Sequence, residues 1–183
     1  MKRRWIAFGL VVLVALAVAG VATAHQVTRI KGTHNDDQLT GTPSADHILA
    51  LAGNDTVSAL DGNDRIVAGP GNDSVDAGPG NDWAHGGPGN DTLLGGDGND
   101  HLRGGQGDDT VDGGPGNDRL HSGAGGDTLI GGDGNDVLFM VVNDDKLDHA
   151  DCGAGHDTVW VNANESDVNA NCETVKTVTV STP

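Results

Sequence analysis

Positive charge is scarce in this chain. Ten Lys and Arg stand against 27 Asp and Glu, which gives a formal net charge of −17 at pH 7. Such an acidic surface makes nucleic acid a poor partner, because phosphate contacts depend on Lys and Arg. The sequence also lacks the His-Glu-x-x-His motif of zinc proteases and the Gly-x-Ser-x-Gly motif of lipase-type hydrolases. We therefore expect a protein that is not an enzyme.

Cysteine is equally rare, with Cys152 and Cys172 as the only two. An exported chain with two cysteines most simply forms one disulfide. Closing a loop of about twenty residues should stabilise the fold by roughly 3 kcal/mol in the chain-entropy model. The alternative is a pair of free thiols.

The N-terminus resembles a secretory signal peptide over residues 1–24. Three positive residues open the chain, residues 6–20 are apolar, and Ala22-Thr23-Ala24 forms a cleavage site. An uncleaved anchor is the alternative, but the apolar run is short for a membrane span. Cleavage would leave seven Lys and Arg against 27 acids, a net charge of about −20. We expect a secreted, extracellular protein with no stable membrane insertion after cleavage.

Aspartate recurs every nine residues through most of the chain, without a gap or insertion. An apolar side chain follows two residues after each aspartate. The thirteen aspartates are Asp37, Asp46, Asp55, Asp64, Asp73, Asp82, Asp91, Asp100, Asp109, Asp118, Asp127, Asp136 and Asp145. The apolar residues are Leu39, Ile48, Val57, Ile66, Val75, Ala84, Leu93, Leu102, Val111, Leu120, Leu129, Leu138 and Leu147.

Each nine-residue unit combines a Gly-rich turn with a short strand. Gly at the first, second and fourth positions permits backbone conformations that are closed to other residues. The last three positions read polar, apolar, polar, which is typical of a half-buried strand. Two units therefore make a flattened coil with a strand on each side. Stacked coils form an all-β parallel β-roll whose narrow interior receives the eighth-position side chains.

Stacking also aligns the carboxylates in two columns. Neighbouring parallel strands lie about 4.8 Å apart. Two carboxylates at about 5 Å repel by roughly 1 kcal/mol in water and by roughly 3 kcal/mol at an effective dielectric of about 20. Ca²⁺ tolerates a cage of carboxylates and turn carbonyls, whereas Mg²⁺ demands strict octahedral geometry. The columns therefore predict Ca²⁺ between the coils, and a largely unfolded chain without it.

The middle of the chain carries the most regular units. They read GGPGNDTLL (86–94), GGDGNDHLR (95–103), GGQGDDTVD (104–112) and GGPGNDRLH (113–121). These units resemble the calcium-binding nonapeptide of the hemolysin-type, or repeats-in-toxin, family, and the resemblance holds over residues 32–148. It implies a right-handed parallel β-roll. The implied carboxylate ligands are Asp55, Asp64, Asp73, Asp82, Asp91, Asp100, Asp109, Asp118, Asp127 and Asp136. The implied backbone ligands are Gly69, Gly71, Gly78, Gly80, Gly87, Gly89, Gly96, Gly98, Gly105, Gly107, Gly114, Gly116, Gly123, Gly125, Gly132 and Gly134.

The repeats degenerate toward both ends. Residues 32–40 and 41–49 keep the aspartate but lose the fourth-position Gly, and residues 140–148 lose all three glycines. Leu51 and Leu60 occupy second positions where Gly is expected. These units should stack, but their calcium sites are in doubt. We expect about six to eleven Ca²⁺ ions on this stacking geometry.

These observations divide the chain into a signal peptide (1–24), a leader (25–31), a β-roll of thirteen units (32–148), a C-terminal cap (149–178) and a tail (179–183). The cap holds one further repeat, Cys152 to Val159, in which Asp157 lies three residues out of phase. Solenoids need atypical end units to cover the open core. We expect the disulfide to lock this cap.

Three classes of function remain open. The first is a stand-alone extracellular calcium-binding protein. The second is a calcium-dependent adhesin or polysaccharide-binding surface protein, and the third is a stabilising module for an enzyme on another chain. The second would use one face of the roll, with Trp83 as a stacking platform for an anionic polysaccharide and with binding that strengthens below about pH 6.5 as His residues become charged. That face should present His47, Arg65, Trp83, His85, His101, Arg103, Arg119 and His121.

Overall fold

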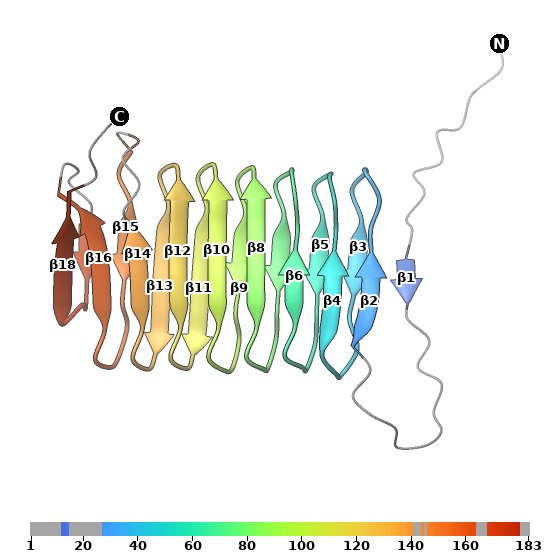
Figure 1. Cartoon of the computed structure of the whole chain (residues 1–183), viewed down its shortest axis with the longest axis horizontal. Coiled ribbons are helices and arrows are strands. Elements are labelled where there is room, and N and C mark those ends of the chain that lie inside the picture. Colours follow the sequence, from blue (N-terminus) through green and yellow to red (C-terminus); the bar gives the residue numbers. More distant parts are fainter. Residues whose placement is uncertain (1–11, 15–26, 141–143, 145, 164–167, 180–183) are drawn as a thin grey trace, which may run out of the picture.

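The protein is a β-solenoid of two parallel sheets (Figure 1). The structure is a computed structural model that describes residues 12–14, 27–140, 144, 146–163 and 168–179. These residues form eighteen strands and no helix. The odd-numbered strands form one sheet, the odd sheet: β1 (Val12–Val14), β3 (Gln38–Thr40), β5 (Thr56–Ser58), β7 (Ser74–Asp76), β9 (Thr92–Leu94), β11 (Thr110–Pro115), β13 (Thr128–Asp133), β15 (His149–Asp151) and β17 (Val168–Ala170). The even-numbered strands form the even sheet: β2 (Thr28–Lys31), β4 (Asp46–Leu49), β6 (Arg65–Val67), β8 (Trp83–Pro88), β10 (His101–Gln106), β12 (Arg119–Ala124), β14 (Val137–Met140), β16 (Thr158–Asn162) and β18 (Thr174–Val178).

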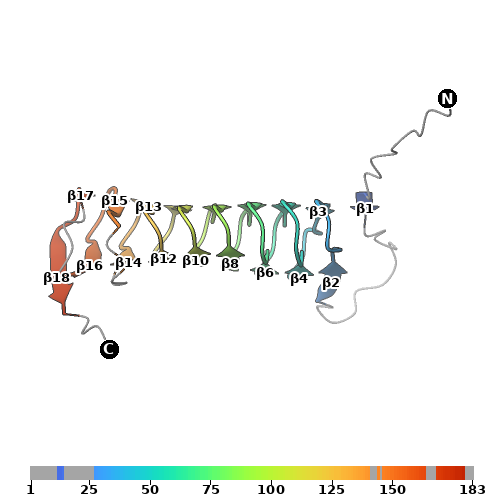
Figure 2. The ribbon, with the colours of Figure 1, turned by 90° about the horizontal axis from the view of Figure 1, so that it is seen from above.

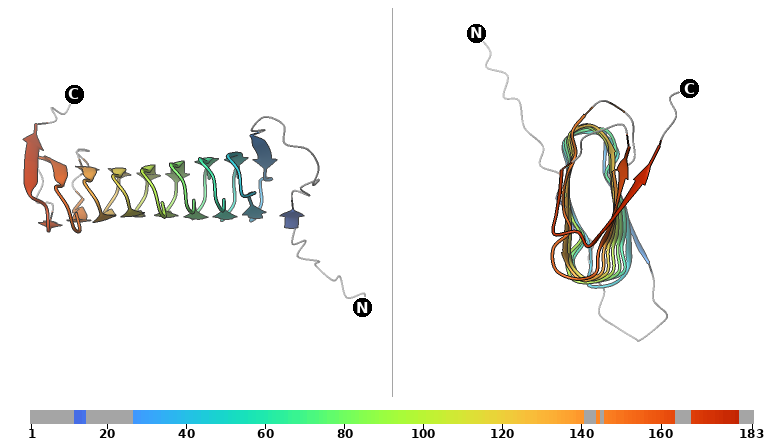
Figure 3. Two further views of the ribbon diagram at one scale, coloured as in Figure 1. Left: turned by 90° about the horizontal axis from the view of Figure 1, so that it is seen from below. Right: turned by 90° about the vertical axis from the view of Figure 1, so that its left-hand side faces the viewer.

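Successive strands alternate between the two sheets, so the chain winds through about eight turns. Seen from above, the two sheets run side by side along the whole described roll (Figure 2). Seen along the long axis, the coils superpose as a flattened ring (Figure 3, right). Through the middle of the roll each residue pairs with the residue eighteen positions later, as Val111 does with Leu129. The parallel β-roll predicted from the nine-residue period is confirmed.

The interior is one continuous hydrophobic core to which strands of both sheets contribute apolar side chains. Every predicted eighth-position residue from Leu39 to Leu138 is at most 2% exposed. First-position side chains enter the same space, because Ala50, Ala59, Ala68, Ala77 and Met140 are fully buried as well. Each buried Leu or Ile contributes about 2 kcal/mol through removal of apolar surface from water.

Glycine at the second and fourth positions of the regular units relieves backbone strain, whereas glycine at the first position leaves space. Gly96 and Gly98 have φ angles of +99° and +142°, which other residues adopt only under strain. Gly95, at a first position, does not have a positive φ; it is limited by space instead. The sequence-based expectation of an unusual backbone at the first position was therefore wrong. Leu51 and Leu60 do adopt positive φ, at 89° and 74°, and so hold strained second positions.

The predicted thirteenth unit, residues 140–148, has the wrong register. Leu147 was expected in the core but is 46% exposed, whereas Ala150 is 5% exposed and lies in the core. Asp148 joins the aspartate column in its place, since its Oδ1 accepts the N–H of Asp127 at 2.8 Å. Asp145 lies outside the described residues. Three extra residues enter the coil here, so strand partners are 21 positions apart, as for Thr128 and His149.

The segment expected as a cap continues both sheets. Strands β15 and β17 extend the odd sheet and β16 and β18 extend the even sheet, all in parallel. The predicted disulfide is present between Cys152 and Cys172, whose Cα atoms are 5.1 Å apart. Cys152 is buried in the core, and Cys172 packs against it. The bridge therefore ties the last coil to the one before it.

The predicted signal peptide lies mostly outside the described residues. Only Val12–Val14 of that segment is described, and it pairs as β1 with β3 at the start of the odd sheet. In the described parts of the chain, no helix is long and apolar enough to cross a membrane.

Candidate calcium site

The aspartates form two hydrogen-bonded ladders, one along each edge of the roll. The backbone N–H of each aspartate donates to Oδ1 of the aspartate on the next coil, as Asp82 does to Asp100 at 2.8 Å. The same bond recurs from Asp37 to Asp157 at 2.7 or 2.8 Å. Each carboxylate from Asp55 onward is therefore fixed in the ladder by one oxygen, which leaves the other oxygen for a separate partner.

That second oxygen lacks a hydrogen-bond partner along most of the roll. It is buried and unsatisfied in eleven aspartates of the described chain. They are Asp55, Asp64, Asp73, Asp82, Asp91, Asp100, Asp109, Asp118, Asp127, Asp136 and Asp157. A buried polar atom without a partner costs about 1–3 kcal/mol, and more when it is charged. A bound cation would compensate the charge of these oxygens in both ladders.

The first two units do not share this feature. The N–H of Thr33 donates to Asp37 Oδ2, and the N–H of Thr42 donates to Asp46 Oδ2, each at 2.5 Å. The two threonine hydroxyls also contact these carboxylates. The chain itself satisfies these two aspartates, so the degenerate units differ from the central ones in chemistry as well as in sequence.

Burial raises the pKa of the central carboxyl groups. Desolvation is the main cause; the N–H of the preceding aspartate lowers the pKa again in part, and neighbouring carboxylates raise it further at most sites. The pKa of Asp82, Asp109 and Asp118 rises to about 7. The pKa of the following groups rises to about 6: Asp64, Asp91, Asp100, Asp127 and Asp136. The protein surroundings alone thus disfavour the charged form that a metal ligand needs.

Backbone oxygens lie beside the unsatisfied carboxylate oxygens. A Cβ added to Gly95 would lie 2.4 Å from Asp100 Oδ2 and 2.5 Å from the carbonyl oxygen of Gly113. A Cβ added to Gly113 would lie 2.4 Å from Asp118 Oδ2 and 2.7 Å from the carbonyl of Gly131. The first-position glycine therefore keeps open a space bordered by one carboxylate and one carbonyl oxygen. Units that begin with Ala, from Ala50 to Ala77, place a methyl group there.

This donor set consists of oxygen atoms. The described residues contain no group of three or more His, Cys, Asp or Glu that could hold a metal ion. A cation in this roll would therefore be bound by carboxylate oxygens together with backbone carbonyls, which are ligands that suit Ca²⁺.

All ten aspartates predicted as ligands lie in the two ladders with a free second oxygen, and the structure adds Asp157. Asp157 belongs to the displaced repeat that begins at Cys152, and the predicted ligands did not include it. That these carboxylates and the turn glycines bind metal remains a prediction.

The chain matches the model of a protein family, the RTX calcium-binding nonapeptide repeat, which spans four copies of the repeat. The matched residues are 31–66, 40–75, 58–93, 76–111, 85–120 and 112–139, which together exceed half of the 183 residues. The chain belongs to the RTX calcium-binding nonapeptide repeat family. Repeats of this family bind Ca²⁺, and their β-roll is a structural calcium-binding fold. A search of curated proteins gave no match. The match to the RTX repeat ends directly before Met140, where the three extra residues enter the roll.

One of the two ladders ends in a glutamate that the sequence did not single out. The N–H of Asp157 donates to Glu173 Oε2 at 2.8 Å, in the place where the ladder would have its next aspartate. This hydrogen bond is the main reason why the pKa of Glu173 lies below its usual value. Glu173 is exposed, so water can solvate its carboxylate.

Proposed function

We propose that this protein is an exported calcium-binding protein whose roll folds when Ca²⁺ binds between its coils. The observation that carries the proposal is the row of eleven buried Oδ2 atoms without a partner. Export is supported by the signal-like N-terminus and by the Cys152–Cys172 disulfide, which suits an oxidising compartment. Low calcium inside the cell would leave the chain unfolded until it is exported.

The residues of each unit have separate roles in this proposal. Oδ1 of each aspartate accepts the N–H of the previous coil and so fixes the carboxylate, while Oδ2 and the turn carbonyls hold the ion. Bound Ca²⁺ supplies the positive charge that the columns lack. We expect about six to eleven ions. The strongest sites should lie in the units that begin with Gly and whose Oδ2 is unsatisfied, because the space beside that oxygen is open; their aspartates are Asp91, Asp100, Asp109, Asp118 and Asp136.

Calcium-coupled folding is tested by far-ultraviolet circular dichroism of the chain from residue 25, first in chelator and then in Ca²⁺. We expect a disordered spectrum that changes to a β-rich one when calcium is added, because metal binding supplies the folding free energy. Mg²⁺ at the same concentration should be far less effective. A β-rich spectrum in chelator at neutral pH would refute the coupling.

A matched pair of substitutions tests the sites themselves. Asp100→Asn retains an acceptor for the N–H of Asp82 but removes the charge of a carboxylate whose Oδ2 is unsatisfied. Asp37→Asn makes the same change where Thr33 already satisfies Oδ2. Calorimetric titration should show at least one ion fewer for Asp100→Asn and an unchanged number for Asp37→Asn. Equal losses in both variants would contradict the assignment.

A further inference from the structure

The positive charge of the protein gathers on one face. Seven Lys and Arg follow residue 24, and six of them lie at outward positions of the even sheet. These six are Arg29, Lys31, Arg65, Arg103, Arg119 and Lys176, and each is exposed. Strand pairing aligns them in two adjacent rows that also contain four His residues. The sequence had assigned only three of the six to this face, because residues 25–31 and 149–178 were not counted as part of the roll.

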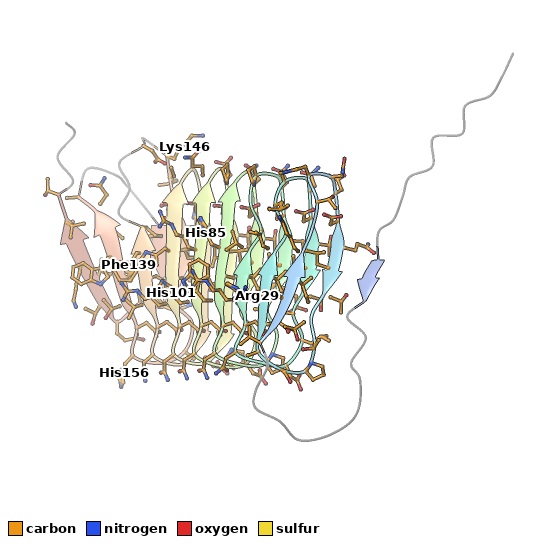
Figure 4. All side chains as sticks on the ribbon, turned by 45° about the vertical axis from the view of Figure 1, so that its right-hand side comes forward. Arg29, His85, His101, Phe139, Lys146 and His156 are labelled. Atoms are coloured by element: carbon orange, nitrogen blue, oxygen red, sulfur yellow. A yellow bond between two sulfur atoms is a disulfide. The ribbon has the colours of Figure 1, made fainter. Side chains whose placement is uncertain are left out.

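The same rows contain no acidic residue. The outward positions from Arg29 and Lys31 on β2 to Thr174 and Lys176 on β18 are free of Asp and Glu, although the chain has 27 of them. The odd sheet is the opposite, with Asp76, Asp112 and Asp151 in its outward rows and no Lys or Arg on its described strands. The two faces of one repeat array therefore differ in the sign of their charge. Figure 4 shows side chains of the even sheet, labelled at Arg29, His85, His101 and Phe139.

Aromatic rings hold three of these six cations in place. The guanidinium carbon of Arg65 lies 4.0 Å from the ring centre of Trp83, and that of Arg119 lies 4.3 Å from the ring centre of Phe139. The Lys176 ammonium lies 4.7 Å from the ring centre of Trp160. Such contacts attract the cation to the negative face of the ring. A stacked guanidinium still presents its N–H edge, which matches carboxylate and sulfate geometry.

Two sequence-based expectations about this face are corrected by these contacts. Trp83 is not a free stacking platform, because Arg65 covers its ring. Burial, together with the neighbouring Arg119 and Arg103, lowers the pKa of His101, and similar causes lower the pKa of His121 to about 4. His121 therefore stays neutral near pH 6.5 and does not strengthen binding there, and His101 becomes charged only at a lower pH than an ordinary histidine.

We propose that the even face binds a linear acidic polysaccharide whose negative charges are spaced along the chain. Cations lie on β2, β6, β10, β12 and β18 of this sheet, so their strands are about 10 Å apart from β2 to β6 and from β6 to β10, about 5 Å apart from β10 to β12 and about 14 Å apart from β12 to β18. A polysaccharide with one carboxylate on every second sugar carries its charges at a comparable, wide spacing. Duplex nucleic acid carries one charge per about 1.7 Å, and its bases would find the rings of Trp83 and Phe139 covered. The width of nine strands, about 40 Å from first to last, fits a polymer rather than a small anion.

This inference rests on the proposed function, because the face exists only in the folded, calcium-loaded roll. The probe is hyaluronate, which has one carboxylate per two sugars, with neutral dextran as its control. The binding assay uses calcium-loaded protein whose fold is first confirmed by circular dichroism. A failure of folding then refutes calcium coupling, whereas a folded roll that does not bind refutes only the polysaccharide face.

Two triple variants distinguish an effect of the even face on binding from an effect of the net charge. Arg65→Ser, Arg103→Ser and Arg119→Ser together remove three charges from the even face. Gln38→Glu, Ser74→Asp and Thr110→Asp together change the net charge by the same amount on the odd face. We expect the first variant to weaken hyaluronate binding at least tenfold and the second to weaken it less than twofold. Equal binding by all three proteins, no binding to hyaluronate, or equally tight binding to dextran, oligo(dT) or polyglutamate would overturn the proposal.

Discussion

The close stacking of the turns makes a strong prediction about single glycines. A Cβ added to Gly98 would lie 1.5 Å from the carbonyl oxygen of Gly80 on the previous coil, and the φ of Gly98 is +142°. The strained φ alone costs about 1–2 kcal/mol for a residue with a Cβ. The coils must also separate, which weakens the hydrogen bond from Gly80 N–H to the Asp97 carbonyl, 2.7 Å in the parent, at about 1 kcal/mol. Gly98→Ala should therefore cost about 2–3 kcal/mol in all.

Gly126 supplies the control within the same repeat array. Its φ is not positive, and an added Cβ would meet nothing closer than the Leu147 carbonyl oxygen at 3.5 Å. Gly126→Ala should be neutral or stabilise by up to about 1 kcal/mol, because Ala restricts the unfolded chain. Thermal melts in saturating Ca²⁺ should place Gly98→Ala about 4–12 °C below the parent at about 2–4 °C per kcal/mol. Equal midpoints for the two variants would refute the claim that the turns stack in contact.

Two more measurements test the carboxylate columns and the disulfide. In chelator, the β content of the chain should rise as the pH falls from 8 to 5. The pKa values of Asp82, Asp109 and Asp118 are about 7 in the roll against the ordinary 3.8, so the folded state binds more protons between about pH 4 and pH 7, and its stability is lost as pH rises through that window. Far-ultraviolet circular dichroism in chelator that shows β content rising with pH would contradict this. Cys172→Ser in calcium should lose roughly 3 kcal/mol by removing the loop closure, and reduction of the parent protein should reproduce the loss; an unchanged melting midpoint would show that the last coil does not depend on the bridge.

The regular part of the fold was predictable from the sequence because the period of nine sets both the core and the columns. Any register that buries Leu102 and Leu120 also stacks Asp100 on Asp118, so a single phase decides everything from residue 37 to residue 140. The free carboxylate oxygen was not predictable in the same way. It depends on the backbone register that gives Oδ1 one N–H donor and Oδ2 none, and a residue pattern does not contain that information.

The register after Met140 could not be read from hydrophobicity. Two triplets compete there, Asp145-Lys146-Leu147 and Asp148-His149-Ala150, and Leu147 is the more apolar of the two candidates. The structure selects Ala150. Burying Leu147 would leave the next repeat three residues out of phase, whereas a single insertion before Asp148 brings both Asp148 and Asp157 into the ladders. The hydrogen bonds that Asp148 and Asp157 make in the ladders therefore outweigh the burial of the larger Leu147 side chain.

The carboxylates at the two ends of the ladders differ from those in the middle in their partners. An end coil has one neighbour, so a cation placed there would lack the ligands of a second coil. At the N-terminal end, Asp37 and Asp46 direct Oδ2 to the N–H groups of Thr33 and Thr42. At the C-terminal end, the ladder of Asp157 stops at Glu173, whose carboxylate accepts the N–H of Asp157 and is exposed to solvent. The first two aspartates thus have donors from the chain for Oδ2, and we propose that a shared cation takes the place of such donors along the rest of the roll.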